Sequence, residues 1–333
     1  MTTELADLSI RSKQSIANPP PRYADLEEWR RYQAFFPERM RCTEATTPAE
    51  ERWAWNGLSV HLDRLAVPGS PIKVIVLHGA GAYGRVMAPA AVLARIHGYE
   101  TVSPDLPGYG LTKVLARRMD YGLWIDCVCD LIDAERARDG RPVMLFGVSL
   151  GGLLAYHAAA RSKRIIGLAV TTLADPREPA VRQGFARTAL LGSAGLFALQ
   201  ALRGLTDGLP LPMRTMCKMD RISNKPELSA LCANDRLGGG NWVPARFLRT
   251  LMNTAPDLEP ENFNVCPVLL AHPGVDRMTE ISLSRRFFDR LAAPKRMVVL
   301  EGASHMPTEP HGLSQLEEAV VDFAEARVRE LRA

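Results

Sequence analysis

Two kinds of hydrophobic pattern alternate along most of the chain: short, continuously apolar runs, and longer segments with apolar residues at helical spacing. A continuous run such as KVIVLH at 73–78 is typical of a strand buried on both faces. The alternation predicts a doubly wound, mostly parallel sheet with helices on both faces. The predicted strands are 73–78, 100–103, 143–146, 165–172, 268–271 and 297–300, and the predicted helices are 86–97, 121–138, 150–160, 281–291 and 313–331.

The segment before this alternation has its own signals. Asn56-Gly57 separate two alternating runs within 52–65, which is the strongest short signal for a β-hairpin. Residues 25–36 (DLEEWRRYQAFF) predict a short helix with an acidic first turn that ends before Pro37. Residues 1–22 are polar and end in three prolines, so we expect a loose arm there. Residues 1–50 are thus predicted to be an arm and a short helix.

The alternation stops near Asp175-Pro176 and resumes only at the run that starts at position 268. Residues 175–257 are helical in pattern, are interrupted by Pro and Gly, and contain no convincing strand. The simplest interpretation is one α/β domain, made of 51–174 and 258–333, that carries an inserted helical cap at 175–257.

Composition narrows the class of protein. The chain has 333 residues, of which 47% are hydrophobic and 23% charged, as in an ordinary globular enzyme. This composition excludes a disordered, collagen-like or coiled-coil protein. The net charge of +4 gives no reason to expect a nucleic acid. Six scattered cysteines predict neither a disulfide scaffold nor a metal site. No uninterrupted apolar stretch reaches roughly 18 residues, and the first residues lack an apolar core. We therefore expect no stable membrane insertion, no signal peptide and a cytoplasmic location.

The strongest chemical signal is GVSLG at 147–151, which lies between a predicted strand and a predicted helix. G-x-S-x-G in that context is a nucleophile elbow, a tight turn that exposes the serine hydroxyl at the top of the sheet. The alternative, a serine that only caps a helix after a glycine turn, explains less of the pattern. Ser149 is the predicted nucleophile.

A serine nucleophile needs a base, and the base needs an orienting acid. His305 lies just past the last predicted strand, whereas the other six histidines lie in a hairpin, on helices or at a strand end. Asp276 follows the strand at 268–271 by a short turn, which gives the chain order Ser149, Asp276, His305 expected for an elbow of this kind. Asp175, just past an earlier strand, is the alternative acid.

Acyl transfer also needs donors for the oxyanion of the tetrahedral intermediate. One predicted donor is the backbone N–H of Leu150, which directly follows the nucleophile. The other is the N–H of Ala80, in the HGAG loop after the first parallel strand, with Gly81 as second choice.

Five motifs in this order, HGAG, DLPGYG, GVSLG, HPGVDR and GASH, resemble the α/β-hydrolase superfamily over roughly 52–173 and 258–331. Within it, 222–240 is weakly similar to the lid of monoacylglycerol lipases and lysophospholipases. One departure concerns the acid loop, where the family reads H-G-x-x-D and this chain has Pro273 at the Gly position. The alignment of Asp276 holds, and a different turn is expected.

Two other classes compete with a hydrolase. GAGAYG at 79–84 is a complete GxGxxG after a strand, and Asp105 stands where a ribose-binding acid would, as in a dinucleotide-dependent oxidoreductase. A ligand receptor that kept the fold is the second competitor. The oxidoreductase would make the elbow, acid and base coincidences, and the presence of all three residues argues against the receptor.

We therefore predict a serine carboxylic ester hydrolase, esterase- or lipase-like, that uses an acyl-enzyme and no metal or organic cofactor. Leu, Phe, Met and Ala are frequent in the cap, so an apolar acyl or aromatic group is expected in the pocket, with Phe197 and Leu199 as substrate contacts. A C–C bond hydrolase, a lactonase or an amidase could use the same residues. The predicted partner is a small ester, and the sequence leaves a homodimer open.

Overall fold

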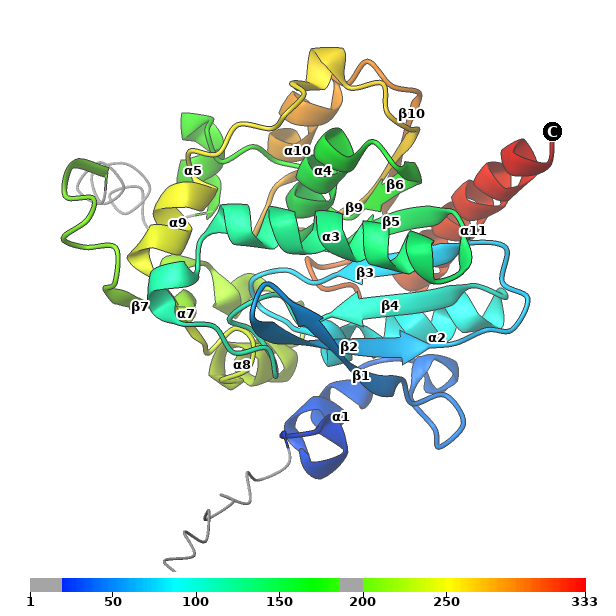
Figure 1. Ribbon diagram of the computed structural model, residues 1–333, viewed down its shortest axis with the longest axis horizontal. Coiled ribbons are helices and arrows are strands. Elements are labelled where there is room, and N and C mark those ends of the chain that lie inside the picture. The colour runs from blue at the N-terminus through cyan, green and yellow to red at the C-terminus, as the bar shows by residue number, and fades with distance from the viewer. Residues whose placement is uncertain (1–19, 186–199) are drawn as a thin grey trace, which may run out of the picture.

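An eight-stranded sheet forms the centre of the protein in the computed structural model, which describes residues 20–185 and 200–333 (Figure 1). The strands run in the order β1-β2-β4-β3-β5-β6-β9-β10. β1 and β2 pair antiparallel with their neighbours, and every pairing from β4 to β10 is parallel. The strands are β1 (Ala49–Trp55), β2 (Leu58–Leu65), β3 (Lys73–Leu77), β4 (Glu100–Pro104), β5 (Val143–Gly147), β6 (Ile165–Val170), β9 (Val268–Pro273) and β10 (Lys295–Leu300).

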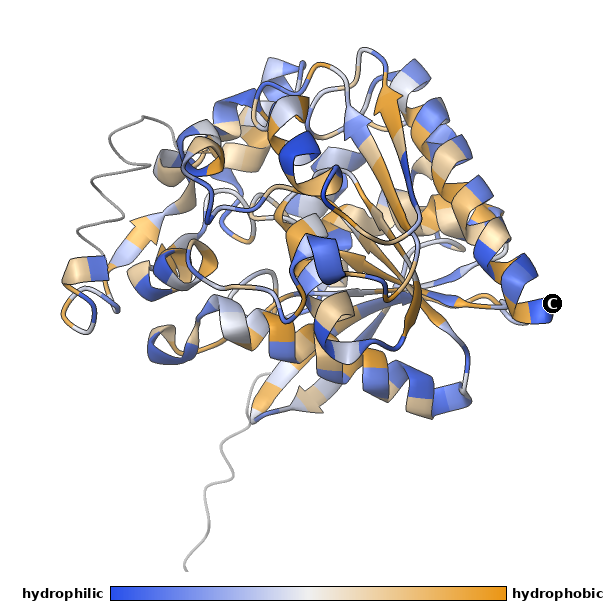
Figure 2. Ribbon diagram, turned by 90° about the horizontal axis from the view of Figure 1, so that it is seen from above, coloured by the Kyte–Doolittle hydropathy of each residue, from blue (hydrophilic) through white to orange (hydrophobic). Residues whose placement is uncertain are grey.

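The central strands are buried because helices cover both faces of the sheet. Every residue of β3, β4, β5 and β9 is buried, which explains their continuous apolar runs in the sequence. Figure 2 shows this apolar centre between helices whose outer sides are hydrophilic. One face carries α3 (Tyr121–Asp139), α4 (Leu150–Ser162) and α10 (Ile281–Phe288), and the other carries α2 (Ala88–Ile96) and α11 (Pro310–Arg332). The predicted fold class is confirmed.

The predicted hairpin is also present. Asn56 and Gly57 have φ values of 45° and 67°, the left-handed conformation that a two-residue hairpin turn requires. β1 and β2 pair from Ala49 opposite Arg64 to Trp55 opposite Leu58. The hairpin extends the parallel sheet at its β4 edge.

The segment between β6 and β9 differs from the prediction in one respect. It contains the expected short helices, but it also contains a small antiparallel sheet of β7 (Pro210–Pro212) and β8 (Trp242–Pro244). The expectation of no strand in 175–257 was therefore wrong. Each strand has three residues and includes proline, so neither produces an alternating pattern. The helices of this segment are α5 (Pro179–Phe185), α7 (Met213–Met216), α8 (Pro226–Asn234) and α9 (Ala245–Leu251).

The helix predicted over 25–36 is shorter than expected. A 3₁₀ turn at Tyr23–Asp25 precedes α1 (Glu28–Gln33), and a second one follows at Glu38–Met40. Tyr23, Trp29 and Tyr32 are buried, so the part of the N-terminal segment that the structure describes is packed onto the molecule. Within residues 20–185 and 200–333, no helix has the length and apolar character needed to cross a bilayer.

Candidate active site

Ser149 occupies a sharp turn between β5 and α4 and has a φ of 56° and a ψ of −127°. This conformation is rare for a residue with a side chain, and the neighbouring glycines allow it. A Cβ on Gly147 would lie 2.3 Å from the carbonyl oxygen of Gly151, and a Cβ on Gly151 would lie 2.3 Å from that of Leu77. Glycine at both positions therefore lets the strand, the turn and the neighbouring strand approach closely.

The structure brings Ser149, His305 and Asp276 together although 156 residues separate the serine from the histidine. Nε2 of His305 lies 2.7 Å from Oγ of Ser149, and Nδ1 lies 2.7 Å from Oδ2 of Asp276. An ionised carboxylate only accepts hydrogen bonds, so Nδ1 donates to Asp276 and Nε2 is placed to accept from the serine hydroxyl. This is the geometry of a nucleophile, a base and an orienting acid.

Asp276 is held in its ionised form. Burial alone would raise the pKa of its carboxyl, but His305 and backbone hydrogen bonds outweigh burial and bring the pKa below its usual range. Its second oxygen, Oδ1, accepts from the N–H groups of Met278 and Thr279 at 2.8 and 2.7 Å. The unusual Pro273 ends β9, and Gly274, one residue later, makes the close approach to β10. The altered turn therefore still delivers Asp276 to His305.

The alternative acid, Asp175, is engaged elsewhere. Its carboxylate accepts from the backbone N–H and the Nε of Arg177, both at 2.8 Å. Arg177 in turn pairs with Glu259 at 2.7 Å, so these residues tie the segment after β6 to the segment before β9. Asp175 serves as a link between these segments.

The HGAG loop after β3 passes directly over Ser149. A Cβ on Gly79 would lie 2.8 Å from the Cβ of Ser149, so only glycine permits this approach. Burial lowers the pKa of His78 and keeps its ring neutral. Its Nδ1–H donates to the carbonyl oxygen of Gly79 at 2.9 Å, and its Nε2 accepts from the N–H of Leu106 at 3.1 Å.

The hydrogen bond from His78 to the carbonyl oxygen of Gly79 fixes the orientation of the peptide group between Gly79 and Ala80. Because a trans peptide places its N–H opposite its C=O, the N–H of Ala80 points away from His78. Within the described residues, the N–H groups of Ala80 and Leu150 donate no hydrogen bond. Both are available to a substrate oxygen.

The same loop contains the GxGxxG motif, and the surroundings of Asp105 argue against a dinucleotide site there. Asp105 is fully buried, and its carboxylate accepts from Tyr23 Oη and from the N–H groups of Gly84 and Leu111, each at 2.7 Å. It therefore has no free position for a ribose. The motif belongs to the loop that passes over Ser149.

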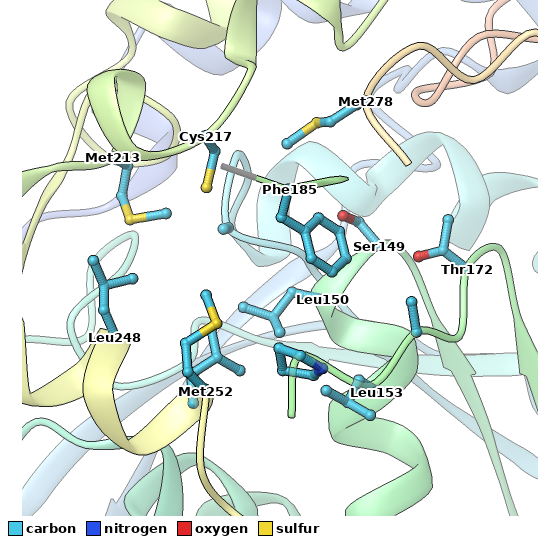
Figure 3. A pocket seen from close by; sticks show the side chains of 14 residues that line it. Ser149, Leu150, Leu153, Thr172, Phe185, Met213, Cys217, Leu248, Met252 and Met278 are labelled. Atoms are coloured by element: carbon cyan, nitrogen blue, oxygen red, sulfur yellow. The ribbon is translucent and has the colours of Figure 1, made fainter. Parts of the chain in front are cut away.

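An apolar cavity opens above Ser149 between the sheet and the segment after β6 (Figure 3). Phe185 lies beside Ser149 in it, with several sulfur-bearing side chains around it (Figure 3). The residues that line it are Ala80, Ser149, Leu150, Leu153, Thr172, Ala174, Pro176, Phe185, Met213, Cys217, Leu248, Leu251, Met252 and Met278.

A second, smaller cavity meets the first at Ser149. The two share Ala80, Ser149 and Met278, but only the second is also lined by His305. It extends under the HGAG loop to Tyr32 of α1. Its other lining residues are Gly79, Gly81, Ala82, Val86, Met87, Val148, Ile222, Cys232 and Met306.

The predicted substrate contacts Phe197 and Leu199 lie outside the described residues. Sequence reasoning did not single out the lining residues of α9 or Tyr32. The apolar spacing at 247, 248 and 251 and the aromatic spacing at 29 and 32 were the available signals, because each marks the buried face of a helix. In the described part of the chain, no three His, Cys, Asp or Glu side chains gather closely enough to hold a metal.

The model of the alpha/beta hydrolase family matches residues 74–322, well over half of the chain. The chain belongs to this family. This α/β hydrolase is similar to two kinds of curated relative over most of its length. It is 28% identical over 229 residues to phospholipase YtpA of Bacillus subtilis, covering 67% of this chain and 83% of that one. It is 28% identical over 263 residues to a pimeloyl-[acyl-carrier protein] methyl ester esterase of Neisseria meningitidis serogroup A, covering 75% and 76%.

The fold of this α/β hydrolase also matches solved structures. A soluble variant of monoglyceride lipase from Saccharomyces cerevisiae, in complex with a substrate analog, superposes with a TM-score of 0.70 at 15% identity. The alignment covers 88% of this chain and 98% of that one, and at this identity it shows the fold alone. The predicted family is confirmed, and so is the enzyme class of carboxylic ester hydrolase at the level of the family and its esterase relatives.

Proposed function

We propose that this α/β hydrolase cleaves a carboxylic ester with an apolar acyl or aromatic group through a serine-bound acyl-enzyme. The observation that carries the proposal is the continuous hydrogen-bonded line from Asp276 through His305 to Ser149, which ends at an apolar cavity. A strained serine, an imidazole hydrogen-bonded to its hydroxyl and an ionised acid are the groups that acyl transfer to a hydroxyl requires.

In the proposed reaction, Oγ of Ser149 attacks the ester carbonyl carbon while Nε2 of His305 takes the hydroxyl proton. The negative charge that develops on the carbonyl oxygen is stabilised by the N–H groups of Ala80 and Leu150. His305 then gives the proton to the leaving alkoxide, and the acyl group stays on Ser149. A water molecule, deprotonated by His305, attacks the acyl-enzyme. His305 then returns this proton to Oγ of Ser149 as the bond to the acyl group breaks and the acid leaves. Asp276 holds the ring and stabilises its charged form throughout.

The two cavities support an assignment of the two halves of the ester. The leaving alcohol must receive its proton from Nε2 of His305, so it belongs in the cavity that His305 lines. The acyl group then lies in the first cavity, whose lining is almost entirely apolar side chains. Several of those side chains come from the segment after β6, which supports the division into a core and a cap at 175–257.

The names of the relatives favour esters over the alternative bonds. Phospholipase and methyl ester esterase both describe ester chemistry, whereas no observation on this chain favours a C–C bond, a lactone or an amide. The substrates in those names belong to those proteins. A cytoplasmic location and a homodimer stay predictions.

The direct test is hydrolysis of p-nitrophenyl esters from acetate to palmitate by the native chain and by Ser149→Ala. We expect turnover of a subset of chain lengths and a loss of about 10⁴- to 10⁶-fold in kcat in the variant, because the nucleophile is removed. Ser162→Ala, at the far end of α4, is the matched control and should keep full activity. Absence of turnover on every ester, or equal activity of Ser149→Ala, would contradict the proposal.

A further inference from the structure

We propose that Asn224 is a positioning residue that holds the acid loop and the base loop in register with each other. The inference rests on the proposed function, because it concerns the alignment of Asp276 and His305. Asn224 lies in the cap segment between a 3₁₀ turn at Met219–Arg221 and α8. It is not part of either catalytic loop.

The side chain of Asn224 contacts both loops at once. On the acid side, its Oδ1 accepts from Nη2 of Arg277 at 3.0 Å, and Arg277 directly follows Asp276. On the base side, its Nδ2 donates to Oε1 of Glu309 at 2.8 Å and to the carbonyl oxygen of Gly302 at 3.2 Å. A guanidinium only donates and a carboxylate only accepts, so these partners fix which way the amide points.

Glu309 carries the contact on to the residue before His305. Its carboxylate accepts from Oγ of Ser304 at 3.0 Å, from the N–H of Ser304 at 3.2 Å and from the N–H of Thr308 at 3.0 Å. Burial opposes its charge, but these backbone hydrogen bonds prevail and bring the pKa of Glu309 below its usual range. An ionised Glu309 is therefore a strong acceptor for Asn224.

The backbone of the same cap segment also binds the residue that follows His305. The N–H of Met306 donates to the carbonyl oxygen of Ile222 at 2.8 Å. His305 is thus flanked by two residues, Ser304 and Met306, that are both tied to positions 222–224 of the cap. Because the cap supplies both ties, the cap sets the distance between His305 and Asp276 as well as enclosing substrate.

An amide is suited to this position for a chemical reason. It presents an acceptor to Arg277 and a donor to Glu309 at the same time. Alanine offers neither, and aspartate offers two acceptors, one of which faces the carboxylate of Glu309. The two loops would then lose one common tether and shift relative to each other.

The test compares Asn224→Ala with the native chain on an ester that the native chain hydrolyses. We expect kcat to fall about 10- to 100-fold, the scale of a small misplacement of catalytic groups, while KM stays nearly unchanged. The control is Asn234→Ala, also in the cap, because among the described residues the amide of Asn234 donates only to the carbonyl oxygen of Ala230 in its own helix. It should leave kcat unaltered.

A rescue experiment separates positioning from simple destabilisation. Asn224→Asp should lose activity, because its carboxylate opposes that of Glu309. Combining it with Glu309→Gln should restore part of kcat, since the glutamine amide can donate to the new aspartate. The inference is wrong if the native chain is active and Asn224→Ala keeps the same kcat. It is also wrong if the double variant recovers no activity relative to Asn224→Asp. Lack of activity in the native chain would instead overturn the proposed function.

Discussion

Ser149 stores backbone strain at the position where the proposed chemistry takes place. A non-glycine residue at a φ of 56° costs on the order of 1–3 kcal/mol, which the surrounding turn must impose. The strain lifts the hydroxyl out of the turn and toward Nε2 of His305. The close contacts at Gly147 and Gly151 show why the elbow has glycine at these two positions.

At the residue scale, the choice of acid can be tested by isosteric substitution. Asp276→Asn should lose about 10⁴-fold in kcat, because the amide favours the wrong tautomer of His305. Asp175→Asn is the matched control. It should lose far less, since Asp175 contacts Arg177 and not the histidine. The measurement is steady-state kinetics of both variants on one ester. A larger loss of kcat in Asp175→Asn than in Asp276→Asn would show that the acid is assigned wrongly.

At the element scale, α1 forms one wall of the cavity that is assigned to the leaving group. Oη of Tyr32 donates to Oδ2 of Asp235 at 3.0 Å and so joins α1 to the end of α8. Asp235 also lines a wide groove on the outer side of this contact, with Leu26, Arg31 and Arg236. The pair Tyr32–Asp235 therefore separates the cavity from the groove.

Removal of the Tyr32 side chain should allow hydrolysis of esters with larger leaving alcohols. Tyr32→Ala should raise kcat/KM for esters of bulky alcohols relative to the methyl ester of the same acid, by about tenfold, the scale on which a pocket discriminates small groups. Tyr99→Ala, a truncation on the side of the sheet that α2 and α11 cover, is the control. If the ratio between the two esters stays constant in Tyr32→Ala, the leaving group does not lie in this cavity.

At the scale of the whole molecule, a buried histidine should make stability depend on pH. Burial lowers the pKa of His157 from 6.5 to about 4. As the pH falls below about 6.5, the unfolded chain binds a proton that the folded chain excludes, so the free energy of unfolding decreases. The contribution is fully present above pH 6.5 and is lost progressively toward pH 4.

Denaturant unfolding at pH 7.5 and pH 5 measures this effect. From pH 7.5 to pH 5, the free energy of unfolding of the native chain should fall by about 2 kcal/mol more than that of His157→Gln. The reason is that each unit of pH below the pKa of the unfolded histidine costs about 1.4 kcal/mol. His311→Gln, at an exposed position, should follow the native chain. Parallel losses in His157→Gln and the native chain would show that His157 is not held neutral by burial.

How far the sequence predicts this molecule depends on how local each signal is. The parallel core and the meeting of Ser149, Asp276 and His305 could be predicted because motifs at strand ends converge on one edge of such a sheet. β7 and β8 could not, since three residues with proline carry no periodicity. Tyr32 and Asp235 are 203 residues apart, and Asn224 acts through a cap loop without a motif of its own. Contacts of that kind arise only from the folded arrangement.

The most direct test of the central claim is labelling with a fluorophosphonate probe, which reacts covalently with an activated serine. The account predicts that the native chain is labelled at Ser149, as mass spectrometry of the modified peptide would show, and that Ser149→Ala is not labelled. Labelling at another residue, or equal labelling of Ser149→Ala, would contradict it.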